Sequence, residues 1–240
     1  MAGRLYGVGV GPGDPDLMTV KAARILAEAT VVAWFAKAGR LGQARSIVEG
    51  RFNPAAETLP LLYPFTTEIE VGEDYRQGMS AFYDESAAKI AQRLQAGRDV
   101  AVLCEGDPFL YGSFMYLHDR LAHRFATDVI AGVTAMSGCW SRAGLAMMRG
   151  DDSLAVLSGT LDEARLVERL RGAEAVVVMK VGRHLAKVRR ALAAAGLLDR
   201  AVYVEKGAMA DERIVRLAEK LDDDAPYFSL VLVPSPRREV

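Results

Sequence analysis

Two acidic, glycine-containing turns hold the residues of this chain that are best placed to do chemistry. Residues 7–17 read GVGVGPGDPDL and residues 105–113 read EGDPFLYGS, so Gly-Asp-Pro occurs twice, at 13–15 and at 106–108. Each turn follows a short apolar run that is typical of a buried strand. Because open α/β sheets bind ligands beyond the carboxyl ends of their strands, we expect both turns to face one pocket. One Gly-Asp-Pro is ordinary turn chemistry, but two copies at strand ends favour a site.

The first turn does not match the nucleotide-binding motifs that glycine-rich loops usually form. A dinucleotide fingerprint needs G-x-G-x-x-G, and its last position would be Pro12 counted from Gly7, or Asp14 counted from Gly9. Proline removes an N–H donor, while Asp14 and Asp16 place negative charge where a phosphate would lie. No Lys-Ser/Thr pair follows, as a triphosphate loop requires. The turn therefore favours a ligand with positive or zwitterionic character.

Alternating strand and helix patterns predict the elements that carry these turns. Continuous apolar runs indicate strands covered on both faces, and apolar residues at helical spacing with capping residues indicate helices between them. The expected strands are residues 4–10, 30–34, 99–104, 127–131, 153–157, 174–179, 201–204 and 228–233, and the expected helices are 19–29, 85–97, 161–172 and 184–196. This alternation predicts an α/β fold. The proline-containing segment 38–75 lacks a clean period, so we expect long loops and a short helix there.

The length and composition of the chain favour two domains and exclude several classes of protein. The strand and helix count restarts near residues 120–127, which predicts an N-terminal α/β domain of residues 1–120, a C-terminal α/β domain of residues 121–240, and a cleft between them. A net charge of -1 gives no basic field for nucleic acid. No apolar run reaches the roughly 18 residues that span a bilayer, and the first residues lack a signal-peptide pattern. We expect a cytoplasmic protein.

The cysteines and histidines of the sequence form no recognisable metal-binding or catalytic motif. Cys104 and Cys139 stand among apolar or small residues, which is typical of reduced thiols in a core. His118, His123 and His184 do not combine with Cys or carboxylates at a metal-ligand spacing, so we expect no protein-bound metal. A Ser-His-Asp pattern and paired catalytic carboxylates are also missing from the sequence.

Three segments together resemble the S-adenosylmethionine-dependent tetrapyrrole methylases. They read GVGVGPGDPDLMTVKAARIL, EGDPFLYGSF and AGVTAMS, and the resemblance covers nearly the whole chain. The form GDPFLYGSFMYL is most similar to the branch that methylates C-20 of precorrin-2 to give precorrin-3A in cobalamin biosynthesis. The resemblance implies two α/β domains with a cofactor cleft between them, and a homodimer. It also implies S-adenosylmethionine as cofactor, S-adenosylhomocysteine as product, and a reduced tetrapyrrole as substrate, with no nucleic acid or membrane partner.

The resemblance implies roles for particular residues at these motifs. Asp14 is the hypothesised catalytic residue, as a proton-handling or pyrrole N–H binding group, and its rival role is to cap the following helix. The implied cofactor-binding residues are Pro12, Glu105, Gly106, Asp107, Ser113, Thr134, Ala135, Met179, Ala208 and Ser229. Around the last two, GAMADER and YFSLVLV depart from the family forms. Core packing for Met179, and helix capping for Ser113 and Thr134, are the alternatives.

Precorrin-2 carries many carboxylates, which a near-neutral protein must meet with local cations. Candidates at strand or loop ends are Lys37, Arg142, Lys180, Arg183 and Lys206, and the alternative is solvated surface charge. The aromatic residues Tyr6, Tyr63, Phe65 and Tyr111 are candidates to line a flat ring, although such residues often lie in a core. The substrate-binding prediction comprises Tyr63, Lys180, Arg183 and Lys206.

Other functions stay open beside C-20 methylation of precorrin-2. Within the same class, the substrate is cobalt-factor II, or the methyl group goes to another ring position. In a different class, the chain is a non-catalytic tetrapyrrole-binding protein on the same scaffold. A dehydrogenase is disfavoured by the broken dinucleotide fingerprint.

Overall fold

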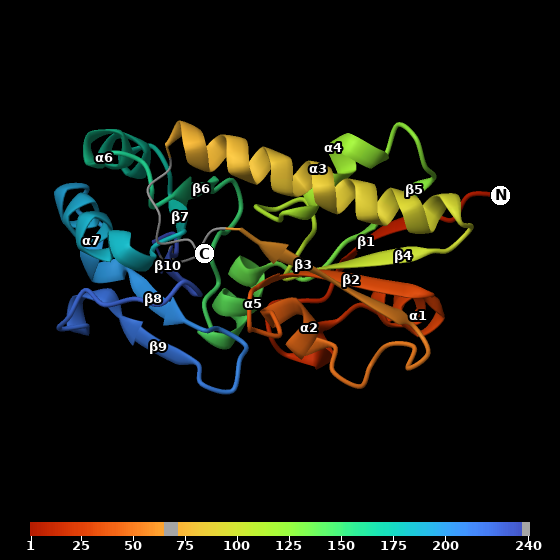
Figure 1. Ribbon diagram of the computed structural model, residues 1–240. Coiled ribbons are helices and arrows are strands. Elements are labelled where there is room, and N and C mark those ends of the chain that lie inside the picture. The colour runs from red at the N-terminus through yellow and green to blue at the C-terminus, as the bar shows by residue number, and fades with distance from the viewer. Residues whose placement is uncertain (65–71, 237–240) are drawn as a thin grey trace. The chain divides into compact units, whose positions relative to one another are not determined.

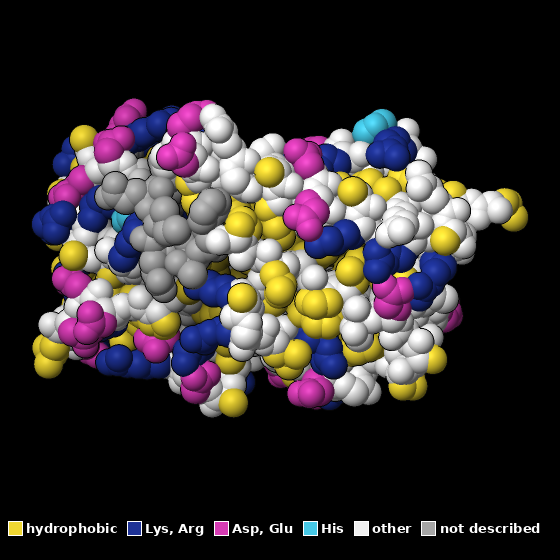
Figure 2. All heavy atoms as spheres, in the orientation of Figure 1, with side chains coloured by type: hydrophobic (Ala, Val, Ile, Leu, Met, Phe, Trp, Pro, Cys, Tyr) yellow, Lys and Arg dark blue, Asp and Glu magenta, His cyan; other side chains and the backbone are white. Residues whose placement is uncertain are grey.

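The computed structural model describes residues 1–64 and 72–236 and divides the chain into two compact units (Figure 1). The units are Met1–Ala135 and Met136–Val240. Within the described residues, no helix is both long enough and apolar enough to cross a membrane. On the face drawn in Figure 2, Lys and Arg side chains are interspersed with Asp and Glu, in keeping with a net charge of -1.

The first unit is built on a parallel sheet with the strand order β3-β2-β4-β1-β5. Its strands are β1 (Leu5–Gly9), β2 (Val31–Lys37), β3 (Glu57–Tyr63), β4 (Val100–Cys104) and β5 (Thr127–Ile130). Helices α3 (Glu73–Gln95) and α4 (Phe114–Leu121) pack on one face, and α1 (Val20–Glu28) and α2 (Gln43–Ile47) pack on the other (Figure 1). Because both faces are covered, the inner strands are almost entirely apolar, and Lys37 at the end of β2 is their one charged residue.

The second unit is built on a mixed sheet with the strand order β6-β7-β10-β8-β9. Its strands are β6 (Leu154–Ser158), β7 (Ala175–Met179), β8 (Val202–Glu205), β9 (Arg213–Arg216) and β10 (Ser229–Val233), of which only β6 and β7 pair in parallel. Helices α6 (Glu163–Arg171) and α7 (Leu185–Ala194) pack on one face, and α5 (Ala135–Arg142) packs on the other. Asp162 caps α6 by accepting a hydrogen bond from the N–H of Arg165 at 2.9 Å.

The predicted α/β fold is confirmed, and every expected strand is present to within a few residues. The prediction for segment 38–75 was incomplete, because β3 lies there beside the short helix α2, and α3 begins at Glu73 instead of residue 85. Pro60 is tolerated because β3 is an edge strand, where a missing N–H breaks no inner ladder. Since β5 pairs with β1, the first unit continues past residue 120 to Ala135.

Glu57, at the start of β3, joins this edge strand to the end of α3 and the segment beyond it. Arg93 donates from Nη2 to Oε1 of Glu57 at 2.7 Å, and Arg98 donates from Nη1 to Oε2. These hydrogen bonds, from Arg93 first and then Arg98, hold the pKa of the Glu57 carboxyl below its usual value. The three side chains therefore fasten β3 to the end of α3 and the segment beyond it most strongly while Glu57 is ionised.

We expect Glu57→Gln to lower the free energy of unfolding by about 1 kcal/mol at pH 7, because the network is partly exposed to solvent. A folded-state pKa below the unfolded value means that the contribution is complete above about pH 4.5 and is lost as the pH falls through the folded pKa. Urea unfolding across this range should show the variant and the parent converging at low pH. Glu163→Gln, which breaks an exposed pair with Arg190, is the control and should have little effect. A difference that does not change with pH would contradict the assignment.

Candidate functional site

The loops that follow β1 and β4 meet at the carboxyl ends of two adjacent strands of the first sheet. An isolated bridge pairs Gly11 with Gly106, in which the N–H of Gly106 donates to the carbonyl of Gly11 at 2.8 Å. One step earlier, the N–H of Val10 donates to the carbonyl of Cys104 at 2.9 Å. The two loops that contain the Gly-Asp-Pro sequences therefore start side by side, at the place where open α/β sheets bind ligands.

The loop after β5 joins them through contacts that only glycine allows. A Cβ atom on Gly132 would lie 2.0 Å from the carbonyl oxygen of Gly106, and one on Gly9 would lie 2.6 Å from the same oxygen. Gly11 and Gly106 also have φ angles of 83° and 65°, in the left-handed region that glycine adopts without penalty. We call Gly9, Gly11, Gly106 and Gly132 the glycine junction. Through it, three loops place backbone next to backbone with no side chain between them.

Asp107 fastens the second turn to the loop after β5. Its Oδ1 accepts a hydrogen bond from the N–H of Phe109 at 2.9 Å, and its Oδ2 accepts one from the N–H of Gly132 at 3.1 Å. Both carboxylate oxygens thus bind backbone groups of the first unit, which gives Asp107 a structural role in the glycine junction.

Replacing Asp107 with alanine should lower the free energy of unfolding by about 1–3 kcal/mol, because two backbone N–H groups lose their acceptor. Asp107→Asn retains one oxygen and should lose about half as much. Urea unfolding of both variants measures the effect. Stability equal to that of the parent for Asp107→Ala would show that the carboxylate does not hold the loops together.

Pro12 and Asp14 both lie in the first turn, but they differ in their exposure to solvent. Pro12 is buried and Asp14 is exposed. Asp14 accepts a hydrogen bond from the N–H of Asp16 at 2.9 Å and caps only the short 3-10 turn Pro15–Leu17. Thr19 caps α1, since its Oγ1 accepts from the N–H of Ala22 at 3.1 Å. The rival role for Asp14, capping the following helix, is therefore wrong.

Glu105 directly follows β4 and brings a titratable carboxyl to this edge of the sheet. Its side chain keeps an open face to solvent, yet the protein atoms around it reduce its hydration and raise its pKa to about 7. The backbone of Ala44 opposes the shift in part. A carboxyl that titrates near neutral pH is able to exchange protons with a ligand.

Ser113 links two tyrosines from different elements. The hydroxyl groups of Ser113 and Tyr63 are 2.6 Å apart, and Tyr83 donates from its hydroxyl to Oγ of Ser113 at 3.1 Å. The Tyr63 ring stacks on Phe35 with a centroid distance of 5.5 Å. Ser113 makes no side-chain cap on α4, so that alternative is wrong. Burial raises the pKa of Tyr83 to about 12, which keeps its hydroxyl protonated as a donor.

Tyr63 and Ser113, predicted from separate segments, are thus brought together, and Tyr83 is a member that the sequence analysis missed. Ala135 opens α5 directly after Thr134, and its N–H group lies close to the glycine junction, 3.4 Å from where a Cβ on Gly106 would be. Tyr111 is partly exposed with a φ angle of 55°, and Tyr6 lies within β1. Phe65 lies outside the described residues.

In the second unit, three predicted residues have a left-handed backbone. The φ angles are 56° for Lys180, 49° for Lys206 and 64° for Ala208. Such conformations are strained in residues other than glycine and tend to occur at ligand sites. Lys180 follows β7 directly, whereas Lys206 and Ala208 follow β8, so the strain is at strand ends.

The remaining predicted residues of the second unit have varied surroundings. Met179 ends β7 and is half-buried, packing against the core beside α5. Ser229 is buried at the start of β10 and donates to the carbonyl of Pro226 at 2.7 Å. Arg183 is exposed in the 3-10 turn Gly182–His184. Lys206 forms an ion pair with Asp211, so this cation already has a carboxylate partner.

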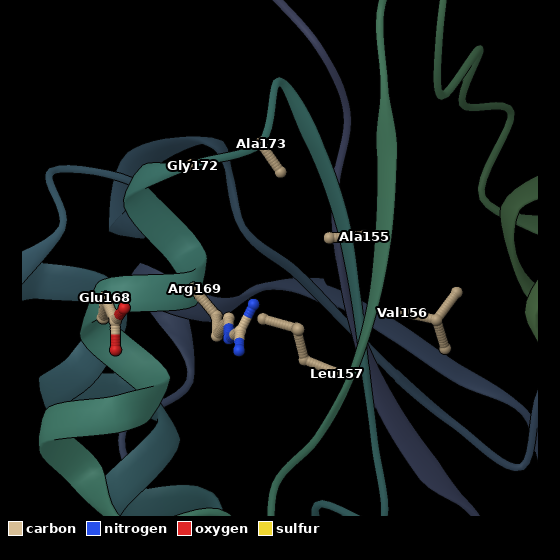
Figure 3. Close-up of a pocket in the computed structure, with 7 residues that line it drawn as sticks. All are labelled: Ala155, Val156, Leu157, Glu168, Arg169, Gly172 and Ala173. Carbon is tan, nitrogen blue, oxygen red and sulfur yellow. The ribbon is translucent and has the colours of Figure 1, made fainter.

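The second unit also has a hollow of about 450 Å³ between β6 and α6 (Figure 3). The side chains of Leu157 and Arg169 lie between the strand and the helix, and Glu168 points away from them. No residue of the predicted site lines this hollow, which is bordered by Ala155, Val156, Leu157, Glu168, Arg169, Gly172 and Ala173. It therefore does not belong to the candidate site.

A comparison with known protein families agrees with the fold and the two acidic turns. The model of the Tetrapyrrole (Corrin/Porphyrin) Methylases matches residues 4–222, and the chain belongs to that family. It is 60% identical over 233 residues to a precorrin-2 C(20)-methyltransferase of Sinorhizobium sp, covering 97% of this chain and 95% of that protein. It is 32% identical to the cobalt-precorrin-2 C(20)-methyltransferase of Salmonella typhimurium, with 97% of both chains covered.

Solved structures of tetrapyrrole methyltransferases have the same fold. A cobalt precorrin-4 methyltransferase, CbiF, matches with a TM-score of 0.73 at 23% identity, over 96% of this chain and 94% of that chain. The uroporphyrin-III C-methyl transferase of Thermus thermophilus complexed with S-adenosylhomocysteine matches with a TM-score of 0.66 at 26% identity, over 97% and 92% of the two chains.

Proposed function

We propose that this chain is an S-adenosylmethionine-dependent methyltransferase that methylates C-20 of precorrin-2 to give precorrin-3A in cobalamin biosynthesis. The observation that carries the proposal is the 60% identity to a precorrin-2 C(20)-methyltransferase along 97% of this chain. Identity to the cobalt-precorrin-2 enzyme is 32%, which favours a substrate without cobalt. We further propose a cytoplasmic homodimer.

The residues present fit the cofactor. The glycine junction holds three loops together at the carboxyl ends of the strands, and the acidic side chains of Glu105 and Asp107 in one of these loops favour a cationic group over a phosphate. When bound, S-adenosylmethionine supplies a methyl group on a positively charged sulfur. The first unit is proposed to bind it through Pro12, Glu105, Gly106, Asp107, Ser113, Thr134 and Ala135, and the second through Met179, Ala208 and Ser229.

The protein's own contribution is to orient the substrate and handle a proton. Holding reactants in position is worth up to about 7–11 kcal/mol, and a reduced tetrapyrrole is already electron-rich, so no protein nucleophile is needed. Asp14 is proposed to bind a pyrrole N–H or accept the proton that is released. Tyr63 is proposed to contact the ring, and Lys180, Arg183 and Lys206 to bind its carboxylates. Lys206 must then exchange Asp211 for a substrate carboxylate.

The decisive experiment incubates the protein with precorrin-2 and S-adenosylmethionine carrying a ¹³C-labelled methyl group. Mass spectrometry should find one added methyl group, and carbon NMR should place it at C-20. A methyl group at another position would reassign the ring specificity, and its absence would favour a non-catalytic binder. Parallel assays with the cobalt-containing substrate should give a lower kcat/KM.

A further inference from the structure

The loop after β8 holds a strained backbone at a buried position. Ala208 has a φ angle of 64° and is only 7% exposed, so its conformation is fixed by its surroundings. An alanine in the left-handed region relaxes unless neighbouring contacts prevent it. The residues that contact Ala208 therefore determine the conformation of this loop.

Helix α5 packs against the loop that follows β8. A Cβ atom on Gly207 would lie 2.4 Å from Sγ of Cys139, so the loop and the helix are in close contact. Cys139 is 4% exposed and belongs to the core on this face of the sheet. This packing sets the distance between the loop and α5, but it does not by itself determine the φ angle of Ala208.

Glu212 supplies a side-chain contact to this conformation, in addition to the turn hydrogen bond in which the N–H of Met209 donates to the carbonyl of Lys206 at 3.0 Å. Its Oε2 accepts a hydrogen bond from the backbone N–H of Ala208 at 2.7 Å. The carboxylate is held in turn by Arg142 of α5, whose Nε lies 2.9 Å from Oε1 and 3.1 Å from Oε2, and whose Nη2 lies 2.8 Å from Oε1. The Glu212 side chain is 13% exposed and that of Arg142 is 59% exposed. A two-pronged ion pair thus orients an acceptor onto one backbone N–H.

We propose that Glu212 is a positioning residue of the cofactor site, which holds Ala208 in its left-handed conformation for contact with S-adenosylmethionine. This inference rests on the proposed function, which places Ala208 among the cofactor-binding residues. The N–H of Ala208 is engaged by Glu212, so only its carbonyl and methyl groups are left for contact with a ligand. Arg142, a candidate for substrate carboxylates, is here assigned to orienting Glu212.

The test measures the Kd of S-adenosylhomocysteine by isothermal titration calorimetry. Glu212→Ala should weaken binding about tenfold, because the free protein then loses the prearranged loop. Glu212→Gln keeps an amide oxygen that accepts from Ala208, so its Kd should stay within about threefold of the parent. Adding Ala208→Gly to Glu212→Ala should recover part of the loss, because glycine adopts the left-handed region without penalty.

Controls separate positioning from general destabilisation. Glu163→Ala removes the carboxylate of another two-pronged arginine pair in the same unit and should leave the Kd unchanged. Should Glu212→Ala not fold, Arg142→Ala, which leaves the acceptor in place but loose, should weaken binding about threefold. Parental affinity in the folded variant overturns the positioning role alone. A parent protein that does not bind S-adenosylhomocysteine overturns the proposed function as well.

Discussion

Gly132→Ala should abolish S-adenosylhomocysteine binding and lower the Tm by about 6–12 °C. The added Cβ would lie 2.0 Å from the carbonyl oxygen of Gly106 and 2.9 Å from Cα of Gly9, and both neighbours are backbone that no side-chain rotation can move aside. The loops must separate, at a cost of about 3 kcal/mol in the free energy of unfolding. The glycine junction then no longer holds together the loops that are proposed to bind the cofactor.

Differential scanning calorimetry and titration with S-adenosylhomocysteine measure the two effects. Gly72→Ala is a matched control, because Gly72 precedes α3 with a φ angle of −103° and has no atom within 4 Å of an added Cβ. This variant should keep the parental Tm and Kd. Parental binding by Gly132→Ala would show that the three loops are not fixed against one another at this point.

The second large effect concerns the rate of methyl transfer. Asp14→Asn should reduce kcat by about 10²-fold, because an amide cannot accept the proton that the substrate releases. The amide oxygen still accepts from the N–H of Asp16, so the turn is retained and the Kd of S-adenosylhomocysteine should change less than about twofold. Single-turnover assays with precorrin-2 measure the chemical step.

Two further variants show whether the loss belongs to the carboxylate of Asp14. Asp14→Ala removes both the carboxylate and the hydrogen bond to Asp16, and its rate should fall at least as far. Asp16→Asn neutralises a neighbouring exposed carboxylate in the same turn and should keep the parental rate. If Asp14→Asn turns over at the parental rate, Asp14 has no part in the mechanism.

The sequence predicts buried strands well because each is a continuous apolar run. It misses two of the four edge strands, β3 and β9, although the edge strands β5 and β6 were predicted. Strand β3 alternates in exposure and contains Pro60, and β9 is the short sequence RIVR with exposed arginines at both ends. Helix α3 begins at Glu73, but its buried residues start only at Phe82, so its first turns show no apolar period. Long-range pairing and packing, rather than local preference, create these elements.

Some residues of the candidate site were likewise predictable from the sequence, and others were not. The acidic turns were predictable because Gly-Asp-Pro directly follows an apolar strand, and parallel strands bring such turns together. Tyr83 and Glu212 were not, because each acts through a side chain far along the sequence. Tyr83 reaches Ser113 from the middle of α3, and Glu212 reaches Arg142 across a separation of 70 residues. No local spacing marks either residue.

The central place of β1 in the first sheet has a consequence for the synthesis of the chain. Leu5 pairs with Val100 on one side and with Thr127 on the other, so β1 has no paired neighbour until β4 is translated and lacks its second neighbour until β5 follows. At about 5–20 residues per second, translation of this stretch takes roughly 5–20 s. Meanwhile the apolar residues of β1 and β2 are open to nascent-chain chaperones and to aggregation. Expression should therefore benefit from lower temperature or added chaperone more than the stability of the finished fold would suggest.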